Sequence, residues 1–262
     1  MNLPPLFNES FPSFIKEQID NCTSVFWYHP EFSQSRYPPG QKKSEACTLI
    51  CLLLAQRISE RKLKILRVEK CLELNILMAE AIIEGNKMHS LILNKGIISH
   101  PYLNTVEALV YGGDNLNKLK EWKFRVIHEK IEKGLSNNIK NFLEDWYKHP
   151  RSENLFMLLI TCGRTIIFIF QNQINKVLLF DSHAHNNFEN KFGLIVAETT
   201  IDNFEVLCHW YIESILHGCY YAFSNQYELA FLYERENGKQ YLKSCNCNNR
   251  GHKLDTKKKM NK

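Results

Sequence analysis

Ser-Glu-Ala-Cys-Thr-Leu-Ile-Cys-Leu-Leu-Leu-Ala, residues 44–55, is the stretch that decides the fold. Ser44 has the side chain of a helix N-cap and Glu45 suits a first turn, so the sequence predicts a helix that starts here. Residues 48–55 are apolar on every side. Because a helix of that kind is buried all round, we expect a central helix on which the rest of the chain packs.

The chain changes from helical to strand patterning near residue 155. Upstream, amphipathic stretches at 71–83 and 119–131 predict a helical subdomain over about residues 58–150. Downstream, short apolar runs separated by turn residues predict an antiparallel sheet over about residues 155–235. Its expected elements are strands at 155–162, 165–170, 176–180 and 194–197, a helix from Thr200 to His217 with Gly218 as its cap, and a strand at 227–233.

The expected architecture is therefore α+β, with a domain over residues 44–242. Residues 1–43, rich in proline and aromatic residues, are predicted to be an irregular leader packed on that domain. Residues 243–262 are predicted to be a basic, flexible tail. No period of 20 to 50 residues repeats, which argues against a solenoid or a propeller.

The net charge of +5, from 33 Lys+Arg and 28 Asp+Glu in 262 residues, belongs to the end of the chain. Residues 250–262 hold six basic residues and one acid, which sum to +5 and leave residues 1–249 neutral. Nucleic-acid binding is therefore expected only weakly, through the tail, because phosphate recognition needs a basic face on the fold itself. The tail lysines 257–259 also resemble a nuclear localisation signal, although terminal lysines are more often plain solvated tail.

The nine cysteines are scattered without the regular spacing of a secreted disulfide framework, so we expect reduced thiols. The start of the chain has no charged and apolar leader pattern, and the longest apolar run, residues 47–55, is half of what a membrane span needs. These features predict a cytoplasmic or nuclear protein with no membrane partner and no cofactor.

Cys47 lies in the first turn of the predicted central helix. Backbone N–H groups and the positive end of the helix dipole converge there and favour thiolate over thiol. That is the placement of a cysteine nucleophile, although a small apolar residue at the start of a core helix explains Cys47 taken alone.

Asp181 and His183 follow the third predicted strand, and alternation along a strand puts them on one face. The carboxylate can hold one ring nitrogen as N–H and leave the other to accept a proton from a thiol. Turn residues of these types are common at strand ends, so neither Cys47 nor the pair is specific by itself. Together they reproduce the cysteine-before-histidine order of one large class of hydrolases.

On these residues the chain resembles the papain-like cysteine peptidase superfamily, with Cys47 as nucleophile and His183 as base. Residues 177–183, with Gly193 ten positions on, look most like the deubiquitinase domain at the N-terminus of herpesvirus large tegument proteins, which takes its acid and base from an Asp-x-His pair. The resemblance covers about residues 36–55 and 155–235 as a layout. It implies ubiquitin or a ubiquitin-like protein as substrate, and leaves the helical subdomain as a surface for a protein partner.

Gln41 lies six residues before Cys47, the spacing of the oxyanion-hole glutamine in papain-type sequences. Its amide and the Cys47 backbone N–H are expected to hold the developing oxyanion. The stretch between them lacks the glycines usual beside such a nucleophile, and the tegument family's glutamine stands farther from its cysteine.

Three other interpretations stay open. Asp181, His183 and His185 match the Asp-x-His-x-His opening of metal-dependent hydrolase barrels, but the 77 residues that follow are too few for the rest of such a barrel. Cys245, Cys247 and His252 offer three zinc ligands at unsuitable spacing. A papain-like domain can also serve as a binding scaffold without catalysis. Hydrolysis and acyl transfer share one thioester intermediate, so the sequence does not separate them.

Overall fold

A computed structural model of the chain describes residues 3–8, 11–186 and 190–235, and the structural statements below concern these residues. The basic tail lies outside them, and with it the predictions made for Cys245, Cys247, His252 and the lysines 257–259.

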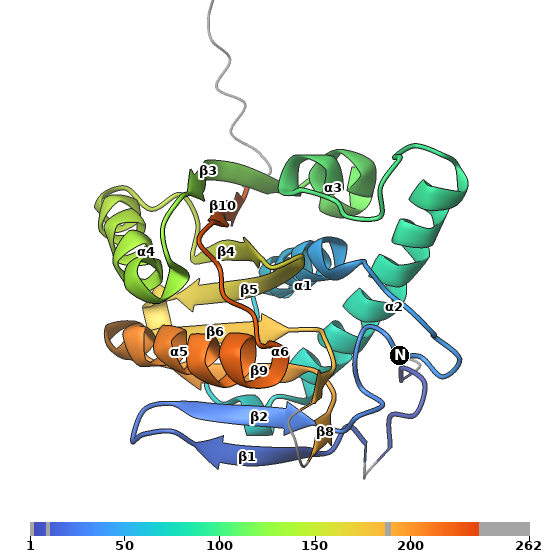
Figure 1. Cartoon of the computed structure of the whole chain (residues 1–262), viewed down its shortest axis with the longest axis horizontal. Helices are drawn as coiled ribbons and strands as arrows, with labels where there is room; N and C mark the ends of the chain where they lie inside the picture. The colour runs from blue at the N-terminus through green and yellow to red at the C-terminus, as the bar shows by residue number, and fades with distance from the viewer. Residues whose placement is uncertain (1–2, 9–10, 187–189, 236–262) are drawn as a thin grey trace, which may run out of the picture.

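An eight-stranded antiparallel sheet runs through the molecule in the order β1-β2-β9-β6-β5-β4-β10-β3 (Figure 1). Sequence neighbours β4, β5 and β6 form its centre as a meander, as the sequence predicts. A two-stranded ribbon, β7 with β8, follows the end of β6. The strands are β1 (Phe14–Gln18), β2 (Ser24–Tyr28), β3 (Leu119–Ile127), β4 (Asn154–Thr161), β5 (Arg164–Gln171), β6 (Lys176–Asp181), β7 (His185–Asn186), β8 (Lys191–Phe192), β9 (Ile195–Thr199) and β10 (Tyr227–Glu234).

Helices cover both faces of the sheet, and each face has its own apolar core. Side chains alternate along the central strands, so Leu178 and Phe180 join one core while Val177 and Leu179 join the other. The first core holds α1 (Cys47–Arg61), α2 (Leu72–Asn94) and α3 (Thr105–Gly112). The second holds α4 (Ile131–Lys148), α5 (Phe204–Trp210) and the π-helical segment η5 (Tyr211–His217), which runs on into α6 (Gly218–Tyr220).

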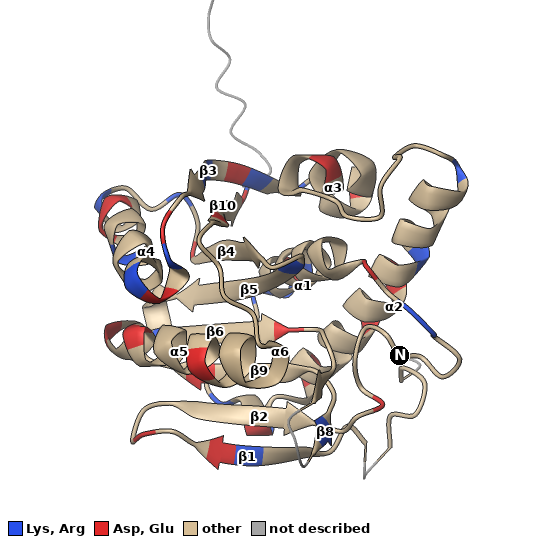
Figure 2. Cartoon of the chain, viewed as in Figure 1, with Lys and Arg blue, Asp and Glu red and all other residues tan. Residues whose placement is uncertain are grey.

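The predicted α+β class is confirmed, and so is the buried central helix. Helix α1 has its first ten residues buried and packs against β5 and α2. Charged residues gather on outer elements such as α4, β1 and β3, while the middle of the sheet is almost free of them (Figure 2). Among the described residues, no helix is long and apolar enough to cross a membrane.

The prediction of an irregular leader is wrong for residues 14–28, which form β1 and β2 at one edge of the sheet. All five residues of β2 are buried, because Val25 and Trp27 belong to one core and Phe26 and Tyr28 to the other. A strand covered on both faces lacks the alternation of apolar and polar residues that marks a half-exposed one. Its aromatic run therefore did not look like a strand.

The predicted amphipathic helix at 119–131 is also wrong, because Leu119–Ile127 is strand β3. It pairs with β10 along its whole length, and α4 begins only at Ile131. The late helix likewise continues past Gly218 to Tyr220, where Tyr221 ends it in the left-handed region at φ 51°. In both places long-range packing overrides a local pattern.

Candidate active site

Helix α1 begins at Cys47 itself, two residues later than a Ser44 cap would place it. Ala46 stands at the cap position without a capping side chain, and the Ser44 hydroxyl instead accepts a hydrogen bond from the Ala46 N–H at 3.2 Å. The Thr48 hydroxyl bonds Thr165 of β5 at 2.8 Å, which fixes this end of the helix on the sheet. Cys47 therefore sits where the unpaired N–H groups of a 15-residue helix converge.

The end of β6 supplies the second half of the site. Asp181 is fully buried, and its Oδ1 accepts hydrogen bonds from the His183 backbone N–H at 3.0 Å and from the His183 ring Nδ1 at 2.6 Å. A carboxylate at this position can only accept, so Nδ1 carries the proton and Nε2 stays available. Sequence reasoning predicted this pair, and the structure brings it together.

The Cys47 thiol and the His183 ring line the same cleft, and their interaction adds a third group to the Asp181–His183 pair. Burial raises the pKa of Cys47, but the hydrogen bond and charge of His183 outweigh it and hold that pKa below its usual value. Burial lowers the pKa of His183, but Asp181 and Cys47 raise it to about 9. The Asp181 pKa is pulled well below its ordinary value, against the effect of burial, by the two histidines beside it. Both pKa shifts favour a thiolate beside an imidazolium.

Gln41 does not join this line. Its amide donates to the Lys43 carbonyl at 2.7 Å, and it is not among the described residues that line the cleft around Cys47. The structure therefore corrects the prediction that Gln41 contacts the oxyanion. The segment before α1 turns the Gln41 side chain back onto its own loop.

Gln34, and not Gln41, lines the cleft with Cys47. It is 1% exposed and donates from Nε2 to the Ser44 carbonyl at 3.1 Å. Its Oε1 accepts from the Ser182 hydroxyl at 2.6 Å, so the acceptor end is fixed and the amide N–H2 faces the start of α1. One amide hydrogen remains for a ligand. The signal in the sequence was the larger glutamine–cysteine spacing of the tegument family, because Gln34 lies farther from Cys47 along the chain than Gln41 does.

The cleft over Cys47 has a volume of about 390 Å³. The segment before α1, the tip of the β4–β5 hairpin and the residues after β6 line it. Arg164, from the hairpin tip, stacks its guanidinium 3.4 Å above the Tyr220 ring. Its lining residues are Gln34, Ser35, Lys43, Ser44, Glu45, Cys47, Tyr102, Cys162, Gly163, Arg164, His183 and Ala184. An acyl group can therefore reach the thiol, the imidazole and the Gln34 amide from one side.

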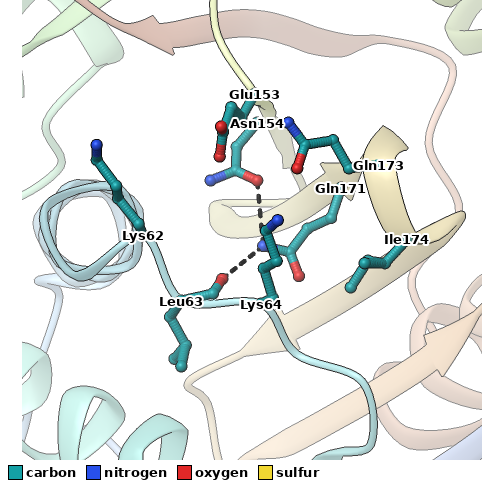
Figure 3. Close-up of a pocket in the computed structure, with 8 residues that line it drawn as sticks. All are labelled: Lys62, Leu63, Lys64, Glu153, Asn154, Gln171, Gln173 and Ile174. Carbon is teal, nitrogen blue, oxygen red and sulfur yellow. Dashed lines mark hydrogen bonds between the residues drawn. The ribbon is translucent and has the colours of Figure 1, made fainter.

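A second pocket lies at the other end of α1, about 22 Å away along a helix of 15 residues (Figure 3). Its polar groups are used within the fold: the Gln171 amide donates to the Leu63 carbonyl at 2.7 Å and to Asn154 Oδ1 at 3.1 Å. The Gln171 carbonyl oxygen accepts from the Ile65 N–H at 2.9 Å. The hydrogen bonds of Gln171 tie the segment after α1 to the sheet, and the pocket lining contains no cysteine or histidine.

The structure does not arrange Asp181, His183 and His185 as the metal-site interpretation expects. The Nδ1 atom of His183 bonds Asp181, while the Nδ1 atom of the fully buried His185 lies 2.7 Å from the Tyr220 hydroxyl. Within the described residues, no three His, Cys, Asp or Glu side chains are arranged to hold a metal ion.

No family model matches the chain, and no curated protein matches it by sequence. Among solved structures, it is similar to the ubiquitin-specific protease encoded by the murine cytomegalovirus tegument protein M48, solved with a ubiquitin-based suicide substrate. The identity is 12% and the TM-score 0.48, over 79% of this chain and 86% of that one. It is also similar to the Pseudomonas avirulence protein AvrPphB, at 11% identity and a TM-score of 0.37, over 73% and 95% of the two chains. Both TM-scores are below 0.5, so neither of these likenesses carries an argument below.

Proposed function

We propose that the chain is a thiol hydrolase that cleaves peptide or isopeptide bonds through Cys47, His183 and Asp181. The observation that carries the proposal is the continuous line from the first residue of a buried helix, through an imidazole, to a buried carboxylate that bonds the far ring nitrogen at 2.6 Å. This is the arrangement that activates a nucleophile and orients its base.

In this mechanism the Cys47 sulfur attacks the carbonyl carbon while His183 holds the proton taken from the thiol. The developing oxyanion is met by the Cys47 backbone N–H and the Gln34 amide. Collapse breaks the carbon–nitrogen bond, and His183 delivers its proton to the leaving amine. Water then attacks the thioester with His183 as base, which releases the carboxylic acid and restores the thiol. Asp181 keeps the ring oriented throughout.

The substrate class follows from the resemblance of residues 177–183 to the tegument deubiquitinase layout: the C-terminal bond of ubiquitin or a ubiquitin-like protein. Tyr102, in the segment between α2 and α3, lines the cleft, so we expect this segment to contact a protein substrate bound there.

The test is a ubiquitin probe with a C-terminal electrophile. We expect a covalent adduct with the native chain, none with Cys47→Ala, and a much slower one with His183→Ala. Cys162→Ser is the matched control, because Cys162 is an exposed thiol that lines the same cleft and its loss should leave the adduct intact. An adduct that survives Cys47→Ala would contradict the proposal.

Two other outcomes have defined meanings. If no ubiquitin or ubiquitin-like probe reacts while Cys47 still alkylates rapidly at pH 6.5, the chemistry stands and the substrate class is wrong. If Cys47 is also unreactive in the folded protein, the domain is a binding scaffold. Acyl transfer would appear as a product in which an added amine replaces water.

A further inference from the structure

Arg164 is the first residue of β5 and lies at the tip of the β4–β5 hairpin. Cys162 and Gly163, the two residues between the strands, are both left-handed, at φ 51° and 70°, as in the tight turns that match the twist of a hairpin. Across this turn Arg164 pairs with Thr161. The Arg164 side chain therefore starts from a fixed backbone position at the edge of the cleft.

The register of β5 and β6 brings Arg164 to the same end of the sheet as His183. The pair of these strands nearest that end is Ile167 with Phe180, and Arg164 and His183 each lie three residues beyond it along their own strand. Both residues line the cleft with Cys47. A positive charge thus stands on the histidine side of the cleft.

The guanidinium of Arg164 is held in place by an aromatic ring. It lies 3.4 Å from the centre of the Tyr220 ring, and the Tyr220 hydroxyl donates to the Ala184 carbonyl at 3.0 Å, beside the cleft. A guanidinium that stacks on a ring keeps its N–H donors at the edge of its own plane. Those donors stay available to a ligand.

Arg164 differs from the other charged residues that line the cleft. Lys43 and Glu45 pair with each other at 2.9 Å, and His183 bonds Asp181 at 2.6 Å. Within the described part of the chain, Arg164 forms no ion pair and no hydrogen bond through its side chain, although it is only half-exposed. A partly buried cation without a counter-ion gains most from an anion that enters the cleft.

We propose that Arg164 forms an anion subsite in the cleft and acts as a specificity residue. It binds a carboxylate of the substrate, supplied by an Asp or Glu side chain close to the scissile bond. The forked N–H donors of a guanidinium match the two oxygens of a carboxylate, whereas a basic side chain at the same place is repelled. The inference rests on the proposed function in that Cys47 is the nucleophile of this cleft.

The experiment compares a negatively charged and a neutral reagent at one thiol. Iodoacetate and iodoacetamide both alkylate Cys47, and the ratio of their rate constants at pH 6.5, followed by mass spectrometry of the Cys47 peptide, measures how the cleft attracts a carboxylate. A change in the pKa of Cys47 affects both rates equally and cancels in this ratio. The exposed thiol of Cys22 in the same sample supplies the reference, and we expect a higher ratio at Cys47.

Variants of Arg164 assign the preference to its charge. Arg164→Gln should lower the ratio at Cys47 by about threefold, the size expected of one charge at a partly exposed site, and Arg164→Lys should retain most of it. Arg151→Gln is the matched control, because Arg151 also lies over a tyrosine, Tyr233 at 5.5 Å, but does not line the cleft. It should leave the ratio unchanged.

A second pair of reagents moves the carboxylate away from the reacting carbon, as on a substrate side chain. The ratio of 3-maleimidopropionate to N-ethylmaleimide at Cys47 should fall in Arg164→Gln as the first ratio does. A native ratio in Arg164→Gln with both pairs, or an equal fall in Arg151→Gln, would overturn the proposal. If Arg164→Gln does not fold, Tyr220→Leu decides: loss of the ring releases the guanidinium and should lower the ratio, and an unchanged ratio overturns the subsite.

Because no ubiquitin is used, this test fails separately from the proposed function. Native Cys47 that reacts no faster than Cys22 with either reagent at pH 6.5 contradicts the proposed function itself. Fast native Cys47 whose ratio does not change in Arg164→Gln contradicts the anion subsite alone.

Discussion

The first and second turns of helix α1 carry one cysteine each, and the two thiols have opposite properties. Cys47 and Cys51 are four residues apart, both are buried, and both interact with Thr165 of β5. Burial raises the pKa of Cys51 well above the usual value of a thiol, whereas the pKa of Cys47 lies below it. The helix and the degree of burial are shared, so neither explains the difference.

The difference in pKa between the two thiols comes from the groups that the end of β6 places beside Cys47. At the first turn, the end of β6 places the His183 ring against the sulfur, and the helix N-terminus adds unpaired N–H groups. At the second turn, Cys51 has the Thr165 carbonyl at 3.7 Å as its hydrogen-bond acceptor, and nothing there stabilises a negative charge. A buried thiol is therefore inert unless a partner outweighs its desolvation.

Replacement of each cysteine by alanine should distinguish the two thiols most clearly. Cys47→Ala is expected to lower hydrolysis of a C-terminal ubiquitin amide by about 10⁴-fold or more, because the nucleophile is lost. Cys51→Ala should keep activity within a few-fold and lower the free energy of unfolding by about 1 to 2 kcal/mol, measured by urea denaturation. Comparable losses of activity in both variants would remove the distinction between the two turns.

Removal of the His183 imidazole should raise the pKa of the Cys47 thiol, so that it resembles the Cys51 thiol. In His183→Ala we expect the pKa of Cys47 to rise above its usual value and kcat/KM to fall by about 10³-fold, since burial then acts unopposed. The pH dependence of alkylation reports the first effect and probe hydrolysis the second. His217→Ala is the matched control, because His217 bonds Glu132 and does not line the cleft. A Cys47 pKa unchanged in His183→Ala would show that the helix terminus alone activates the thiol.

The proposed oxyanion contacts sharpen the comparison further, because Gln34 lines the cleft at the first turn of α1 and not at the second. Gln34→Glu keeps the acceptor for Ser182 but loses the amide donor, and should lower kcat by about 10²-fold with little change in KM. Gln41→Glu, its matched control outside the cleft, should leave kcat within about twofold. Equal effects at both positions would contradict the reassignment from Gln41 to Gln34.

A separate expected effect concerns the pH dependence of stability. The folded pKa of His185, about 4, lies below its unfolded value of 6.5, so between these values the unfolded chain binds more protons. Its contribution to stability is thus present above pH 6.5 and is lost as the pH falls toward 4, by on the order of 3 kcal/mol. The raised pKa of His183 acts oppositely: its contribution is present below 6.5 and is lost as the pH rises through about 9.

Urea unfolding of the native chain and of His185→Gln at pH 4.5, 5.5 and 7 measures the first of these terms. We expect the difference in unfolding free energy between the two proteins to change over this range, with the variant less sensitive to acid. Parallel curves would mean that His185 does not stay neutral in the folded state.

Local sequence patterns correctly predicted those parts of the fold in which the residue pattern agrees with the tertiary packing around it. The β4–β6 meander is three apolar runs between turns, and Asn175 takes the left-handed conformation that such a turn needs, at φ 49°. Strand β3 shows the opposite case. Trp122, Phe124 and Val126 alternate as strand residues do, but the same segment also fits a helical face, and only pairing with β10 selects the strand.

Two features follow from the sequence alone. The uniformly apolar run after Cys47 requires burial on every side, and the Asp-x-His spacing puts a carboxylate beside an imidazole; both depend on residues close together in the chain. Tertiary structure decided the rest. The proximity of Cys47 to His183, the position of Gln34 in the cleft, and the contact of His185 with Tyr220 join segments far apart in sequence. Spacing along a chain does not determine distances across loops, because many loop paths fit one spacing until packing on the sheet selects one.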